Sequence, residues 1–180
     1  MKAFLRSPLE HMLQGLAYWL AYRDVVYKKT VIEAIAVDEA FQILQTHLPV
    51  GYKVVSEYPY KHIDKSFGNK HADLAIINTT GIYECLIEFK LADNTNGGYA
   101  KDVTKLHPVK TSFSNVDCYV VILYRKSCLI NQPKELVMPN GKAKRKTHVN
   151  KSTIAVRRVY TALRSQTAKR MKRVICIELL

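Results

Sequence analysis

Two short apolar segments of this chain carry charged residues in their interiors. Residues 71–77 contain Asp73, and residues 85–91 contain Glu88 and Lys90. Both segments are bounded by turn-forming residues, a pattern that predicts strands. An ionised carboxylate inside a half-buried strand costs free energy unless a cation or hydrogen-bond donors compensate it. The pattern therefore predicts a sheet with a cation site on one face.

Alternation of side chains along a strand places Glu88 and Lys90 on the same face. Residues 78–81 fit a hairpin turn, so an antiparallel pairing brings Asp73 beside Glu88. Carboxylate oxygens suit Mg²⁺, which keeps water ligands and bridges to substrate phosphates. Lys90 is then close to the position where negative charge grows during phosphodiester hydrolysis. We expect Asp73 and Glu88 to bind Mg²⁺, with Mn²⁺ as a substitute.

The order of Asp73, Glu88 and Lys90 resembles the PD-(D/E)xK nuclease superfamily over roughly residues 31–125. Members have an aspartate in the second strand and a Glu-x-Lys pattern in the third. The proline of the superfamily's name is absent before Asp73. The resemblance implies a restriction-endonuclease-like fold and a metal-dependent endonuclease that hydrolyses phosphodiester bonds in DNA.

A helix glutamate commonly joins the metal site of this superfamily, and Glu33 is the first candidate for this third ligand. It falls on the helix face that should turn toward the sheet. One alternative is Glu39, which lies beside an adjacent apolar stripe. A second is a structural role, in which Glu33 completes a capping box with Thr30. Glu57, at the end of the first strand, is either a further ligand or a solvated strand end.

The order of elements predicts an α/β fold in which helices flank a central mixed sheet of four to five strands. A capping box at Ser7 starts an N-terminal helix that ends near Lys28. An α-β-β-β-α-β core follows, expected as a helix from Thr30 to before Pro49, strands over 52–58, 73–78 and 82–91, a helix over 99–109 and a strand over 118–125.

The C-terminal part is expected to be a basic addition to this core. Residues 126–150 read as a long basic loop. Residues 151–180 read as a basic extension, with a helix over 152–169 and a strand over 173–179. We expect residues 1–180 to form a single nuclease-like domain.

The net charge of +13 is concentrated near the C-terminus. Between Lys134 and Arg173 lie thirteen of the 28 Lys and Arg residues but one of the 15 Asp and Glu residues. Such a segment is typical of proteins that bind polyanions, and we expect DNA as the partner. The expected nucleic-acid contacts are Lys101, Lys105, Lys144, Arg145, Lys146, Arg157 and Arg158.

Other function classes lack their motifs. The four cysteines form no CxxC pair, and no HExxH cluster or phosphate-cradling glycine loop is present. With no apolar run of membrane-spanning length and no signal-like N-terminus, we expect a cytoplasmic protein without a membrane partner. Dimerisation is common in the superfamily, which makes a homodimer a further expectation. The alternative function is a non-catalytic nucleic-acid-binding protein on a similar scaffold.

Overall fold

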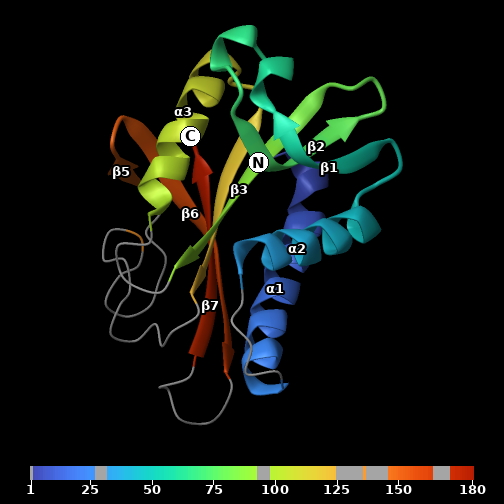
Figure 1. The fold of residues 1–180 in the computed structure, drawn as a ribbon, viewed down its shortest axis with the longest axis vertical. Coiled ribbons are helices and arrows are strands. Elements are labelled where there is room, and N and C mark those ends of the chain that lie inside the picture. Colours follow the sequence, from blue (N-terminus) through green and yellow to red (C-terminus); the bar gives the residue numbers. More distant parts are fainter. Residues whose placement is uncertain (1, 27–31, 93–97, 125–135, 137–145, 164–170) are drawn as a thin grey trace.

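A seven-stranded mixed sheet organises the structure, a computed structural model that describes residues 2–26, 32–92, 98–124, 136, 146–163 and 171–180 (Figure 1). The strand order is β1-β2-β3-β4-β7-β6-β5. The strands are β1 (Tyr52–Pro59), β2 (His71–Asn78), β3 (Tyr83–Ala92), β4 (Asp117–Tyr124), β5 (Thr147–Val149), β6 (Ser152–Leu163) and β7 (Met171–Leu179). The expected α/β class is confirmed, whereas the expected sheet of four to five strands was too small.

The strands β1, β2 and β3 form an antiparallel meander, and the hairpin predicted from residues 78–81 connects β2 to β3. A helix, α3 (Tyr99–Ser112), then connects β3 to its parallel neighbour β4. Parallel neighbours need such a crossover because the chain must return to the same end of the sheet. The described chain thus contains the expected β-β-β-α-β sequence.

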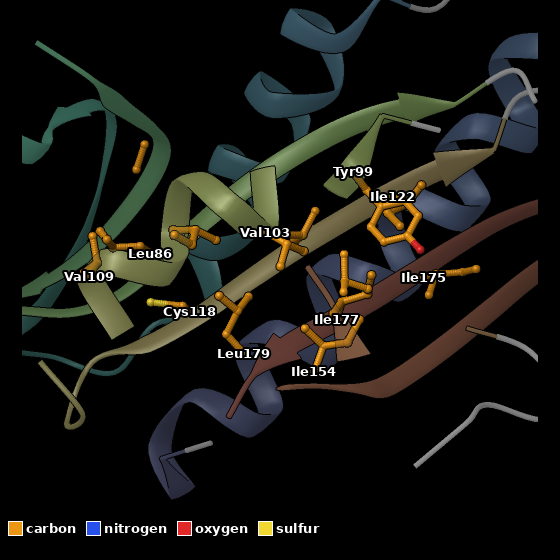
Figure 2. Close-up of a cluster of buried hydrophobic side chains, with 14 of the residues drawn as sticks. Leu86, Tyr99, Val103, Val109, Cys118, Ile122, Ile154, Ile175, Ile177 and Leu179 are labelled. Carbon is orange, nitrogen blue, oxygen red and sulfur yellow. The ribbon is translucent and has the colours of Figure 1, made fainter. Parts of the chain in front are cut away.

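Helices cover both faces of the sheet (Figure 1). The helices α1 (Arg6–Val26) and α2 (Glu33–His47) share one apolar core with alternate residues of the central strands, such as Ile87 and Val121. The intervening residues, such as Leu86 and Ile122, pack with α3 on the other face. Figure 2 shows this second core, in which α3 lies over β4 and β7. The central strands are therefore apolar on both faces.

The expected helix over residues 152–169 was wrong. Residues 152–163 form β6, which pairs antiparallel with β7 from Ile154 to Leu163. Thr, Ile, Val and Tyr residues occur throughout this stretch, and such side chains favour a pleated, half-buried surface. Pairing with β7 gives this strand its backbone hydrogen bonds.

Part of the expected loop over residues 126–150 is also a strand. Residues 147–149 form β5, which pairs with β6 at the end of the sheet. Leu136 is buried in the same core cluster as the α3 residues Val103 and Leu106. Residues 125–135 and 137–145 lie outside the described residues.

The first two helices begin close to their expected positions. The helix α1 starts at Arg6, next to the expected cap Ser7. The helix α2 starts at Glu33, while the expected cap Thr30 lies outside the described residues. None of the helices in the described part of the chain has the length and apolarity needed to cross a membrane.

Candidate active site

The β2–β3 pairing places Asp73 beside Glu88. Leu74 pairs with Ile87, so Asp73 and Glu88, the next residues along the two antiparallel strands, lie opposite each other. The backbone N–H of Phe89 donates a hydrogen bond of 2.6 Å to Asp73 Oδ2. Burial raises the pKa of Asp73, although the Phe89 hydrogen bond and the charge of Lys105 oppose this effect. Both carboxylates thus lie on neighbouring strands, as the hairpin predicted.

Glu88 is almost completely buried, with 2% of its surface exposed. The Tyr60 hydroxyl donates to Glu88 Oε1 over 2.5 Å, and Lys105 Nζ donates to Oε2 over 2.8 Å. Burial raises the pKa of Glu88 to about 7, although the hydrogen bonds from Lys105 and Tyr60 act in the opposite direction. A buried carboxylate with a raised pKa beside a cation is typical of functional sites.

Glu33 reaches the same end of β3 from the first turn of α2. Its Oε2 accepts a hydrogen bond of 2.8 Å from the backbone N–H of Leu91 and lies 3.5 Å from Lys90 Nζ. The Glu33 carboxylate is therefore bound to β3. Glu39 lies further along α2 and does not line the cleft described below.

Lys90 approaches α3 as well as Glu33. Gly98 precedes the first turn of α3 with a left-handed backbone, φ +67°. A Cβ atom at this position would lie 3.3 Å from Lys90 Cε. The absence of a side chain at residue 98 thus leaves room for Lys90.

An open cleft of about 370 Å³ lies beside Glu33 and Asp73. Glu33, Asp38, Glu57 and Asp73 contribute carboxylates to its lining, and Val37 and Phe41 contribute apolar surface. Glu57 falls between the β1–β2 pairs of Ser56 and Tyr58 and has a left-handed backbone, φ +50°. Such strain in a residue other than glycine often marks a functional site.

Asp102, Lys105 and Tyr60 join the site although the sequence did not assign them to it. Asp102 Oδ2 is buried and has no hydrogen-bond partner among the described residues. Burial raises the pKa of Asp102 to about 6, and the charges of Lys90 and Lys105 oppose this increase. Asp102 and Lys105 are three residues apart, which places them on one side of α3. This helical spacing was the available sequence signal.

The expected nucleic-acid contacts occupy different surroundings. Lys101 and Lys146 are exposed to solvent, whereas Lys105 points to Glu88. Arg157 forms an ion pair with the buried Glu178, and Arg158 forms one with Glu10 of α1. Lys144 and Arg145 lie outside the described residues.

The carboxylates around the cleft form an all-oxygen donor set, which matches the preference of Mg²⁺. Within the described ranges, no three or more His, Cys, Asp or Glu side chains are already arranged to hold a metal ion. Asp73, Glu88 and Glu33 instead accept hydrogen bonds from protein donors. The donor chemistry therefore fits Mg²⁺, while the described carboxylates are paired with protein donors rather than arranged around one ion position.

Comparison with protein-family models, with curated proteins and with solved structures gives no match. The functional argument consequently depends on the site itself.

Proposed function

We propose that this chain is a Mg²⁺-dependent endodeoxyribonuclease with a restriction-endonuclease-like core. The observation that carries the proposal is that three acidic residues and Lys90 lie on, or bind to, the second half of β3. Asp73 and Glu88 come from paired strands. Glu33 accepts a hydrogen bond from the backbone N–H of Leu91, and its Oε2 lies 3.5 Å from Lys90 Nζ. An open cleft adjoins Glu33 and Asp73, so that a substrate can reach them.

The proposed metal ligands are Asp73, Glu88 and Glu33. The chemistry supplied by a bound Mg²⁺ is stabilisation of the negative charge that develops on the attacked phosphodiester. The Phe89 and Leu91 amides hold Asp73 and Glu33 against β3, which limits the motion of these carboxylates. The ligands are thus held by the sheet itself.

Lys90 supplies the cation in this proposal. About a third of its side chain is exposed, so its ammonium group can meet a phosphate that enters from solvent. A fixed positive charge favours the transition state when it faces developing negative charge.

DNA binding is supported by the charge of the chain. The net charge of +13 favours association with phosphate backbones, and Lys101 and Lys146 are exposed to solvent. Such contacts position the duplex without reading its sequence.

A plasmid-cleavage assay with Mg²⁺ or Mn²⁺ tests the activity. We expect the unmodified protein to nick or linearise supercoiled plasmid, and Asp73→Asn and Lys90→Met to abolish cleavage. Glu39→Gln is the matched control, because Glu39 lies on the same helix as Glu33 but does not line the cleft. Equal cleavage by all four proteins would refute the assignment.

A second candidate function is nucleic-acid binding without catalysis. It is favoured by the internal partners that Asp73, Glu88 and Glu33 already have. This function predicts DNA binding that weakens steeply with salt, does not depend on divalent ions and leads to no hydrolysis. Binding measured with and without EDTA separates the two functions.

A further inference from the structure

Both oxygens of the Glu88 carboxylate already have donors within the protein. Tyr60 donates its hydroxyl to Oε1, and Lys105 donates its ammonium to Oε2. Glu88 is 2% exposed, which leaves little space around the carboxylate for an additional group. In this buried position, a metal ion that binds Glu88 competes with these two donors for the carboxylate oxygens.

Lys105 is the donor that can leave. Tyr60 is 1% exposed, and its ring is fixed by an edge-to-face contact with Phe67. Lys105 has a flexible side chain, a quarter of which is exposed to solvent. Moving Lys105 gives up its position over the Tyr60 ring, where Nζ lies 5.5 Å from the ring centroid, whereas moving Tyr60 would disturb a ring that is buried in the core. The metal-free site thus contains one fixed donor and one exchangeable ammonium.

An acceptor for the displaced ammonium lies on the same helix. Asp102 comes three residues before Lys105, and its buried Oδ2 has no hydrogen-bond partner among the described residues. Residues at this spacing are neighbours on a helix surface. A buried carboxylate oxygen without a donor is unfavourable, so it would gain from the arrival of an ammonium group.

We infer that Lys105 is a positioning residue that occupies the cation position at Glu88 in the metal-free protein and moves to Asp102 when a divalent ion binds. This inference depends on the proposed function, because it takes Glu88 to be a metal ligand. The exchange keeps Glu88 compensated in both states. It also makes metal binding a competition with an internal ion pair.

Titration with Mn²⁺ alone, followed by the electron paramagnetic resonance signal of the free ion, measures this competition. At a pH where Glu88 is ionised, we expect Lys105→Met to bind Mn²⁺ about tenfold more tightly, since one charge-assisted hydrogen bond no longer competes. Lys105→Arg keeps the charge and should bind like the unmodified protein. Lys101→Met is the matched control, because it removes one positive charge from a solvent-exposed lysine one turn before Lys105 on the same helix.

Asp102 is tested in two backgrounds. Asp102→Asn should weaken Mn²⁺ binding several-fold in the unmodified protein and have no effect in Lys105→Met, because Asp102 acts through Lys105. Nitrogen-15 NMR of the lysine ammonium groups adds a direct observation. A protected Lys105 signal should be present in the metal-free protein and should shift on addition of Mg²⁺.

Each adverse outcome has a distinct meaning. If Lys105→Met and the unmodified protein bind Mn²⁺ equally well, the movement of Lys105 is overturned. If Lys101→Met increases the Mn²⁺ affinity as much as Lys105→Met does, it is also overturned, and the increase reflects a general charge effect. Equal weakening by Asp102→Asn in both backgrounds overturns the transfer to Asp102. Failure of the proposed metal site gives a different result. The unmodified protein would then either bind no Mn²⁺ or bind it in a way that Asp73→Asn does not weaken.

Discussion

The backbone amide of Phe89 donates a 2.6 Å hydrogen bond to Asp73 Oδ2 and thereby links β3 to β2 next to the paired residues Leu74 and Ile87. This contact gives Asp73 a structural role in addition to the proposed catalytic one. The two roles respond differently to substitution, because an asparagine side chain retains an acceptor oxygen and an alanine does not.

Asp73→Ala should reduce the free energy of unfolding by about 1–3 kcal/mol, because the Phe89 amide loses its acceptor in a partly buried position. Asp73→Asn should retain most of the stability. Both variants should lose metal-supported cleavage, since neither has a carboxylate. Urea unfolding measures the first effect and plasmid cleavage the second. A stable and active Asp73→Ala variant would contradict both roles.

Glu33→Gln tests whether Glu33 or Glu39 is the helix carboxylate of the site, a choice that the sequence left open. The amide oxygen of glutamine can still accept from Leu91 N–H, so stability should change little, whereas the negative charge next to Lys90 is lost. We expect the cleavage rate to fall on the order of a hundredfold, as for removal of other electrostatic groups in active sites. Glu39→Gln should cleave normally. The reverse result would make Glu39 the helix carboxylate.

Glu88 should make the metal-free protein less stable as pH rises. Burial raises its pKa from 4.5 to about 7, so between these values the folded protein holds a proton that the unfolded chain has released. Stability therefore falls across this window, by about 3 kcal/mol in total, and then levels off above pH 7. Urea unfolding from pH 4.5 to 8 without divalent ions measures the effect.

Glu88→Gln is the control for this pH dependence. Glutamine does not titrate, so the variant should lack the part of the decline between about pH 6 and 7, whereas Asp102, whose pKa is raised to about 6, still contributes at lower pH. The variant should exceed the unmodified protein in stability at pH 8. It should also lose Mn²⁺ binding and cleavage. A Glu88→Gln variant that retained the whole decline would assign it to other groups.

The part of the site that the sequence predicted depends on local geometry. The short turn and the strand alternation place Asp73 next to Glu88, because a hairpin with a defined register leaves few alternatives. Glu33 was selected from the helix face that turns toward the sheet, and its carboxylate contacts the backbone of β3. The donors to Glu88 were missed, since Tyr60 and Lys105 reach it only through the packing of α3 and the segment after β1.

The strand β6, by contrast, was not predicted from the sequence. Arg157 and Arg158 interrupt the alternation of β6, and the chain shifts register between Val156 and Arg158 in the pairing with β7. A basic stretch with this pattern reads equally well as an amphipathic helix. The strand is specified by its pairing with the apolar β7, and the residues of β6 alone do not reveal this pairing.

Exposed lysines and paired arginines should contribute differently to DNA binding. Lys146→Met should weaken binding and reduce by about one the slope of the logarithm of affinity against the logarithm of salt concentration, because one phosphate contact is lost. Arg158→Met should leave this slope unchanged, since Glu10 already compensates the Arg158 charge. Fluorescence anisotropy with labelled duplex DNA at several salt concentrations measures both. A reduced slope in Arg158→Met would place that arginine on the DNA.

Gly98→Ala tests the space reserved for Lys90. The substitution introduces a side chain at φ +67° and places a Cβ 3.3 Å from Lys90 Cε. We expect a loss of about 1 kcal/mol in stability from the backbone alone. Cleavage should fall further than this loss explains, because Lys90 must also move away from α3. Gly81→Ala is the matched control, since its φ of +81° is also positive and no atom lies within 4 Å of an added Cβ. Similar stability losses with a cleavage defect in Gly98→Ala alone would connect this glycine to the position of Lys90, whereas identical cleavage would show that the contact has no catalytic consequence.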